Sequence, residues 1–291
     1  MRRGIILAAA LALWTLTLVL VAVAVVLITV DRPAAYDLLF YVPEVLAFST
    51  AGALVAWRRP RMLAGWLLVA VGLVWTVVAA LHAYVNHILA AGPAGPPAGG
   101  LAAWVANWVW ILAFVALWSF FLTFPDGRLP DPYWWIVVWV GVVGAALVLV
   151  GRSLTPGPLA EFPAIDNPYG AHGGGAILRD AVAVGQLLTA IASIASIASL
   201  FVRFRRADRV QRQQLRWMVL AAGVYLAGAV LQDILHLLGG GLDAGDVFLG
   251  LIAGVPIAAA IAIMWQGRKP IKGQVVAASP ETRKPGRRRA S

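Results

Sequence analysis

Residues 5–30 read IILAAALALWTLTLVLVAVAVVLITV and contain no charged side chain. About 20 apolar residues in an α-helix cross the hydrocarbon core of a bilayer, so this run of 26 residues is long enough to span a membrane. It follows Met1-Arg2-Arg3 and is longer than the roughly 7–15 apolar residues of a secretory signal peptide. We therefore expect an uncleaved membrane-spanning helix.

Seven further apolar runs follow the first. Of the 291 residues, 61% are hydrophobic and 12% are charged, which leaves too little polar surface to cover a water-soluble fold. The sequence predicts an all-α fold, a polytopic transmembrane helical bundle occupying residues 1–266 as one domain. Residues 267–291 are basic, contain Pro and Gly, and are expected to form a disordered cytoplasmic tail. The eight expected spans are 5–30, 38–57, 62–87, 101–124, 134–152, 181–202, 217–238 and 247–265.

The distribution of basic residues predicts the orientation. If the eight spans alternate in direction, 20 of the 23 Lys and Arg residues fall on one side, and the three exceptions are Arg32, Arg152 and Arg179. Because cytoplasmic loops retain Lys and Arg, we expect both termini to lie in the cytoplasm and the protein to lie in the cell membrane. The basic residues sit at helix ends and in the tail, so they are expected to face anionic lipid rather than nucleic acid.

The residue types favour a protein without catalytic activity. The chain has no Cys, which excludes disulfides, thiolate metal ligands and a cysteine nucleophile. An intramembrane enzyme needs a nucleophile and a base at one depth, and the serines of span 181–202 have no His near them. No cofactor is expected. A zinc site is chemically admissible but has no supporting ligand spacing; its candidate ligands are Glu44, His82, Asp233 and His236.

Polar residues of five predicted spans lie close to one depth. At 1.5 Å per residue, they fall on the order of 8–9 Å below the outer surface, and His236 lies one turn above Asp233. One interpretation is that they are interfacial residues and interhelical hydrogen bonds. The other is an outward-opening pocket that binds a small ligand, a lipid headgroup or a proton, since ionisable residues within a bilayer usually mark function. The candidate ligand-binding residues are Glu44, His82, Asn107, Gln186, Asp233 and His236.

A polar but helix-favouring segment, 203–217, follows the sixth predicted span. Asp208 and Gln211 have the spacing of a capping box, which predicts that the next helix begins near Arg209. Arg209, Arg212 and Arg216 then share one helix face. This face either binds lipid phosphates or docks a cytoplasmic partner.

Several short motifs occur in a fixed order over roughly residues 50–240. They are Arg58-Arg59-Pro60 with Gly65-Trp66-Leu67-Leu68, then Phe124-Pro125-Asp126-Gly127-Arg128-Leu129-Pro130, then Asn167-Pro168-Tyr169-Gly170, and finally Arg203 to Arg206 with Arg212 to Trp217. On these motifs the chain resembles the N-terminal multi-span membrane region of actinobacterial sensor histidine kinases. The resemblance implies signal perception or anchoring by the membrane part. The 25 residues after Gln266 hold no phosphoacceptor helix and no ATP-binding boxes, so the kinase activity is not carried over.

We therefore expect a non-catalytic integral membrane sensor or regulatory protein of a signal transduction system, such as a two-component system. It would act through a histidine kinase, another membrane subunit or a second copy of the chain. The alternative is a transporter or lipid-handling protein, which needs a polar path across the bilayer. The inner halves of the predicted spans contain almost no ionisable residues, so the polar layer resembles a blind pocket.

The predicted orientation can be tested with single cysteines, because the chain has none of its own. A cysteine at Gly95 should react with a membrane-impermeant thiol reagent added to intact cells, because it lies in a predicted external loop. A cysteine at Ala207 should react only after the cells are opened. The opposite labelling pattern would reverse the orientation.

Overall fold

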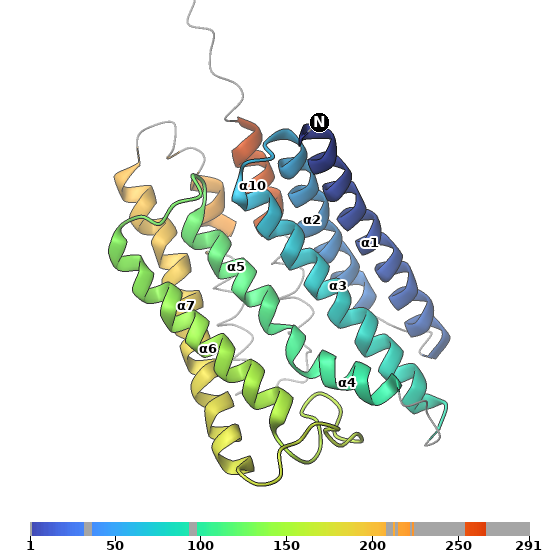
Figure 1. The fold of residues 1–291 in the computed structure, drawn as a ribbon. Coiled ribbons are helices and arrows are strands. Elements are labelled where there is room, and N and C mark those ends of the chain that lie inside the picture. The colour runs from blue at the N-terminus through green and yellow to red at the C-terminus, as the bar shows by residue number, and fades with distance from the viewer. Residues whose placement is uncertain are drawn as a thin grey trace, which may run out of the picture.

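The computed structural model describes residues 2–31, 37–92, 98–207, 212, 215–221, 223 and 254–265. Within these ranges the structure is helical and contains no named strand; one isolated antiparallel bridge pairs Pro158 with Asp166. The helices pack side by side as a bundle (Figure 1). Their bounds are α1 Arg2–Asp31, α2 Asp37–Arg58, α3 Leu63–Ala90, α4 Ala98–Val109, α5 Ile111–Thr123, the 3-10 turn η1 Pro132–Trp134, α6 Trp135–Leu154, α7 Gly175–Arg206 and α10 Gly254–Trp265.

Five helical segments of the described chain are long and apolar enough to cross a membrane. They are Gly4–Val30, Leu63–Ala90, Gly99–Thr123, Pro132–Leu154 and Gly175–Arg206. These agree with five of the expected spans. The expected span 38–57 coincides with α2, which packs against α1 and α3. The expected span 217–238 lies largely outside the described residues, and α10 covers only the second part of the expected span 247–265, so the count of eight spans stays a prediction.

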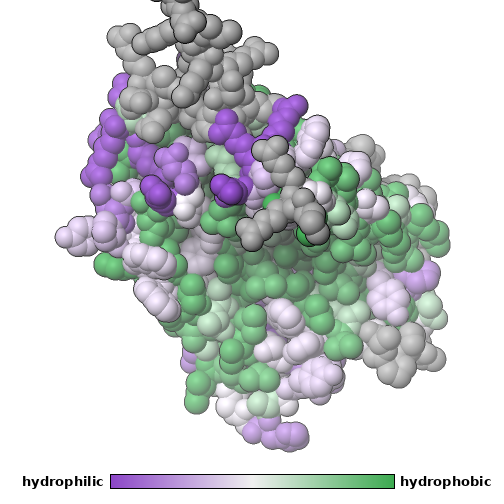
Figure 2. Space-filling model, turned by 45° about the horizontal axis from the view of Figure 1, so that its top comes forward, coloured by the Kyte–Doolittle hydropathy of each residue, from purple (hydrophilic) through white to green (hydrophobic). Residues whose placement is uncertain are grey.

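The helices alternate in direction and so separate two ends of the bundle. The start of α1, the α2–α3 turn, the α5–α6 turn and the end of α7 lie at one end, and α4 and the loop 155–174 lie at the other (Figure 1). Hydrophilic side chains gather near the first end, and hydrophobic side chains cover much of the helix flanks (Figure 2). Exposed apolar side chains on these flanks include Val19, Val26, Trp139, Leu187 and Ile194. A lipid environment would cover these residues.

The expected span 101–124 is broken into two helices, α4 and α5, at Trp110. The indole Nε1 of Trp110 donates a hydrogen bond of 3.2 Å to the backbone carbonyl of Asn107. A side chain that enters the ladder of backbone hydrogen bonds is a recognised cause of a helix kink. The break lets α4 turn away from the axis of α5 at the end of the bundle that carries the loop 155–174 (Figure 1). We name this end the outer end and the opposite one the inner end, after the orientation that the sequence predicts.

Helices α6 and α7 approach each other closely at two glycines. A Cβ atom added to Gly144 would lie 2.9 Å from the carbonyl oxygen of Gly185, and one added to Gly185 would lie 2.7 Å from the carbonyl oxygen of Gly144. Backbone atoms of a packed helix cannot move aside as a flexible side chain can. Small residues of this kind let transmembrane helices approach and gain van der Waals contact.

We predict that Gly144→Ala destabilises the protein by about 1–3 kcal/mol, because the added methyl group forces α6 and α7 apart. Gly100→Ala is the matched control, since a Cβ at Gly100 meets nothing within 4 Å. Thermal unfolding of both variants in a mild detergent measures the difference. Equal midpoints for the two variants would contradict the close packing of α6 and α7.

Candidate functional site

Asn107 connects three parts of the outer end of the bundle. It lies in α4 and is only 2% exposed. Its Nδ2 donates to the carbonyl of Arg152 in α6 at 2.9 Å, and its Oδ1 accepts hydrogen bonds from the Arg152 guanidinium at 3.5 Å and from the backbone N–H of Glu161 at 3.3 Å. One buried amide thus joins α4, α6 and the outer loop.

Glu161 lies between two potential cations. Its Oε1 is 3.1 Å from the Arg152 guanidinium, and its Oε2 is 3.9 Å from Nε2 of His82 in α3. The neighbouring imidazole of His82 and the charge of Arg152 hold the pKa of the Glu161 carboxyl below its usual range, although partial burial opposes the shift. The other ring nitrogen of His82, Nδ1, is 2.9 Å from the carbonyl of Val78, which orients the imidazole.

The outer loop 155–174 is ordered by its own hydrogen bonds. Leu159 N–H donates to Ile165 at 2.9 Å, and the side chain of Asn167 donates to the carbonyls of Ser153 and Thr155 at 3.0 and 2.8 Å. Leu159 and Phe162 are buried against α3 and α4. The loop is therefore docked on the helices.

A pocket of about 310 Å³ lies between this loop and helices α4, α6 and α7. Asn107, Arg152 and Arg179 are its larger polar side chains, and its apolar wall includes Pro156, Leu159 and Val182. The Arg152 guanidinium also lies 5.6 Å from the ring centre of Trp110. The ring stabilises the guanidinium charge by a cation–π interaction. The buried Nε of Arg152 has no hydrogen-bond partner among the described residues.

The predicted polar layer is only partly brought together. Asn107 lines the outer pocket, and His82 joins it through Glu161. Glu44 is buried in α2, 1% exposed, and its Oε1 has no hydrogen-bond partner in the described chain. Gln186 is exposed on α7. Asp233 and His236 lie outside the described residues.

Three residues of the outer site, Arg152, Glu161 and Arg179, are absent from the ligand-binding residues that the sequence predicts. The sequence does set Arg152 and Arg179 apart, because they are two of the three basic residues that fall on the predicted outer side. No comparable signal marks Glu161, because its role depends on how the loop folds back. Among the described residues, no three His, Asp or Glu side chains lie close enough together to hold a metal ion; of the admissible zinc ligands, Asp233 and His236 are outside this part of the chain.

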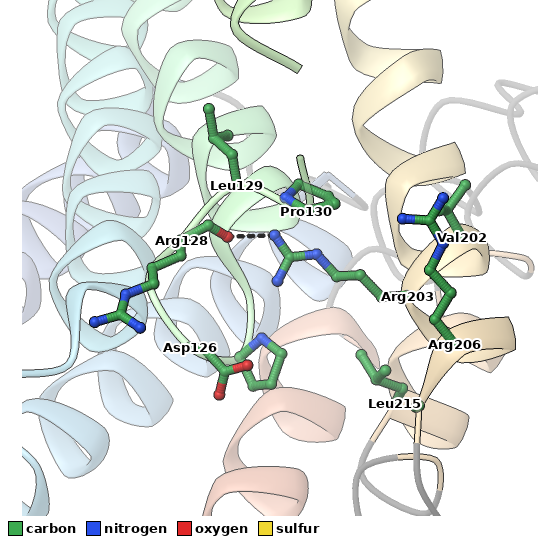
Figure 3. Close-up of a pocket in the computed structure, with 10 residues that line it drawn as sticks. Asp126, Arg128, Leu129, Pro130, Val202, Arg203, Arg206 and Leu215 are labelled. Carbon is green, nitrogen blue, oxygen red and sulfur yellow. Dashed lines mark hydrogen bonds between the residues drawn. The ribbon is translucent and has the colours of Figure 1, made fainter. Parts of the chain in front are cut away.

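The opposite end of the bundle has a second pocket, of about 350 Å³, between the α5–α6 turn and the end of α7. The Arg203 guanidinium donates to the carbonyls of Leu122 and Arg128, and Arg206 pairs with Asp131 at 2.7 Å. Figure 3 shows the Arg128 carbonyl directed at Arg203 while the Arg128 guanidinium points away. The turn from Phe124 to Pro130 is therefore tied to α7.

Two of the three predicted partner-binding arginines, Arg212 and Arg216, lie beside this second pocket. The Arg212 guanidinium is 3.5 Å from the carbonyls of Arg205 and Ala207 and 5.6 Å from the ring centre of Phe204. A cation at the C-terminus of a helix is favourable, because the last carbonyls carry partial negative charge. Arg216 is exposed, and Arg209 lies outside the described residues.

Comparison with protein-family models, with curated proteins and with solved structures found no match for this chain. The likeness to sensor-kinase membrane regions is thus an expectation that depends on the motifs of the sequence. Two of these motifs have structural roles here: Asn167 holds the outer loop, and the turn from Phe124 to Pro130 accepts the Arg203 guanidinium. The geometry of the two ends therefore carries the functional argument.

The docking of the outer loop should depend on pH through Glu161. Because the pKa of this carboxyl is lowered by docking, its ionised form stabilises the docked loop above about pH 4, and this stabilisation is lost as the pH falls through the lowered pKa. A spin label on a cysteine at Ala164, an exposed loop position, should become more mobile at acid pH. Glu161→Gln should remove this response, and Asp166→Asn in the same loop should keep it. A label with equal mobility at pH 7 and pH 3 would contradict this role of Glu161.

Proposed function

We propose that this protein is a non-catalytic membrane sensor or regulatory protein, in which the outer pocket receives a signal and the basic inner end passes it to a partner. The observation that carries the proposal is that α7 lines both pockets, one near each of its ends. Arg152 and Arg179 line the outer pocket, and Arg203 and Arg206, at the far end of α7, line the inner one. Helix α7 thus contributes to both pockets, and α6, packed against it, connects the outer pocket to the α5–α6 turn.

The pair is fixed in three places along its length. The outer loop bonds to the end of α6 through Asn167, Gly144 and Gly185 touch in the middle, and Arg206 pairs with Asp131 just before α6 begins. Tightly packed helices move together as rigid units, because the interface between them has a few discrete arrangements and does not deform continuously. A ligand that displaces α7 at the outer pocket would therefore move the α5–α6 turn at the other end.

The charge distribution supports the direction of this signal. The end that carries Arg58, Arg128, Arg203 and Arg206 is the basic one, and retained positive charge favours a cytoplasmic location. The outer pocket would then face the outside of the cell membrane. With eight spans, both termini would lie in the cytoplasm.

A cytoplasmic or membrane partner would receive the signal from the inner end. The exposed arginines of the inner end offer charged groups to an acidic surface, and the resemblance to sensor-kinase membrane regions suggests a histidine kinase supplied as a separate chain. A second membrane subunit or a second copy of this chain would be recognised by the same surface. The bilayer itself is the other expected partner, since anionic headgroups bind basic helix ends.

Reversal of two inner charges tests the proposal. In the double variant Arg212→Glu and Arg216→Glu, a partner that co-purifies with the parent protein should be lost, because both side chains would then repel its acidic surface. Arg61→Glu, an exposed arginine at the same end of the bundle, is the matched control. Because Arg212 bonds the last carbonyls of α7, a slightly lower unfolding midpoint is expected for the double variant, and the partner should be lost at temperatures where both variants stay folded.

The competing function has its own measurement. If partner recovery is unchanged in the double variant and the purified protein takes up a labelled solute into proteoliposomes, the protein is a transporter rather than a sensor. Uptake that exceeds that of empty vesicles is the result that would decide this.

A further inference from the structure

The outer pocket has a polar side and an apolar side. Arg152 and Arg179 supply two guanidinium groups from neighbouring helices, and Asn107 lies beside them. Opposite them lie rings and branched side chains of Pro156, Pro158, Leu159 and Val182. A pocket with this division fits a molecule that has one polar end and an apolar body.

The polar side is built for a negative charge. The two guanidiniums are hydrogen-bond donors only, and no carboxylate lines the pocket. Glu161 neutralises Arg152 from the side of His82, but no ion pair is found for Arg179 within the described chain. The cavity therefore keeps an excess positive charge that an oxyanion would balance, and guanidinium matches carboxylate and phosphate oxygens in geometry.

The size of the cavity limits the ligand. At about 30 Å³ for each water-sized group, 310 Å³ holds on the order of ten heavy atoms. This is the small end of the usual range for ligand pockets. It admits a short-chain carboxylate or the phosphate-bearing headgroup of a phospholipid whose chains lie largely outside it.

We propose that the outer pocket binds an oxyanion carried on a short apolar body, with Arg152 and Arg179 holding the charged end and the Pro156–Leu159 wall covering the rest. This inference depends on the proposed function, since it names the chemical class of the signal. Arg152 is also part of the network that docks the loop, so its guanidinium joins the ligand to the loop. Arg179 is exposed and lies one turn before Val182, so it serves the ligand without a role in that network.

Titration calorimetry of the delipidated full-length protein in a neutral detergent tests the proposal with three probes. Hexanoate stands for a soluble carboxylate, dihexanoyl phosphatidylglycerol stands for a lipid phosphate, and hexanamide is the uncharged control. Hexanoate, the phospholipid or both should bind at least tenfold more tightly than hexanamide. Arg179→Gln should weaken that binding by about 10- to 100-fold, because a hydrogen bond to a charged group contributes about 1.5–3 kcal/mol.

Arg61→Gln, at the opposite end of the bundle, should bind as the parent protein does. Binding of hexanoate alone identifies a soluble anion, and binding of the phospholipid alone identifies a lipid headgroup. The proposal is overturned if neither anion binds, if hexanamide binds equally well, or if Arg179→Gln binds as the parent does. None of these results affects the charge-reversal test at Arg212 and Arg216, so the sensor proposal stands or fails separately.

Discussion

The buried amide of Asn107 is the contact on which the outer half of the structure depends. A polar side chain in an apolar surrounding is costly unless its hydrogen bonds are made, and Asn107 makes them to α6 and to the outer loop. Once the amide fixes the end of α6, the Arg152 guanidinium is held beside Glu161, and the loop closes over the pocket. The amide of Asn107 thus acts together with the hydrogen bonds of Asn167 and the buried side chains of Leu159 and Phe162 to form the pocket.

At the inner end as well, one side chain supplies the hydrogen bonds that polar groups need, and here the donor is Arg203. A reverse turn leaves backbone carbonyls without partners, and Arg203 supplies donors to the carbonyls of Leu122 and Arg128 from a neighbouring helix. Arg206 adds an ion pair with Asp131, which is partly exposed and therefore contributes little stability by itself. Its effect is geometric, since it fixes where α6 begins relative to the end of α7.

The sequence predicts the all-helical class and five of the spans, because the length of an apolar run can be read directly from consecutive residues. It predicts Asn107 and His82 as site residues because polar groups within an apolar run are rare. It does not predict that Gln186 is exposed, since depth along a helix says nothing about which face a residue occupies. Nor does it predict Glu161 or the break at Trp110, because both depend on contacts with residues that are distant in the chain or on a side chain that bonds its own helix.

The close contact of α6 and α7 bears on the choice between a sensor and a transporter. Transport by alternating access requires helices to separate so that a pocket opens on each side in turn. Gly144 and Gly185 bring backbone against backbone, and separation would forfeit the dispersion contacts on which helix association in lipid depends. Movement of α6 and α7 together as a packed pair costs less, because it keeps these contacts and the ion pair of Arg206 with Asp131. Such a movement would connect the outer pocket to the turn at Arg203 without opening a path through the bilayer, as the proposed sensor function requires.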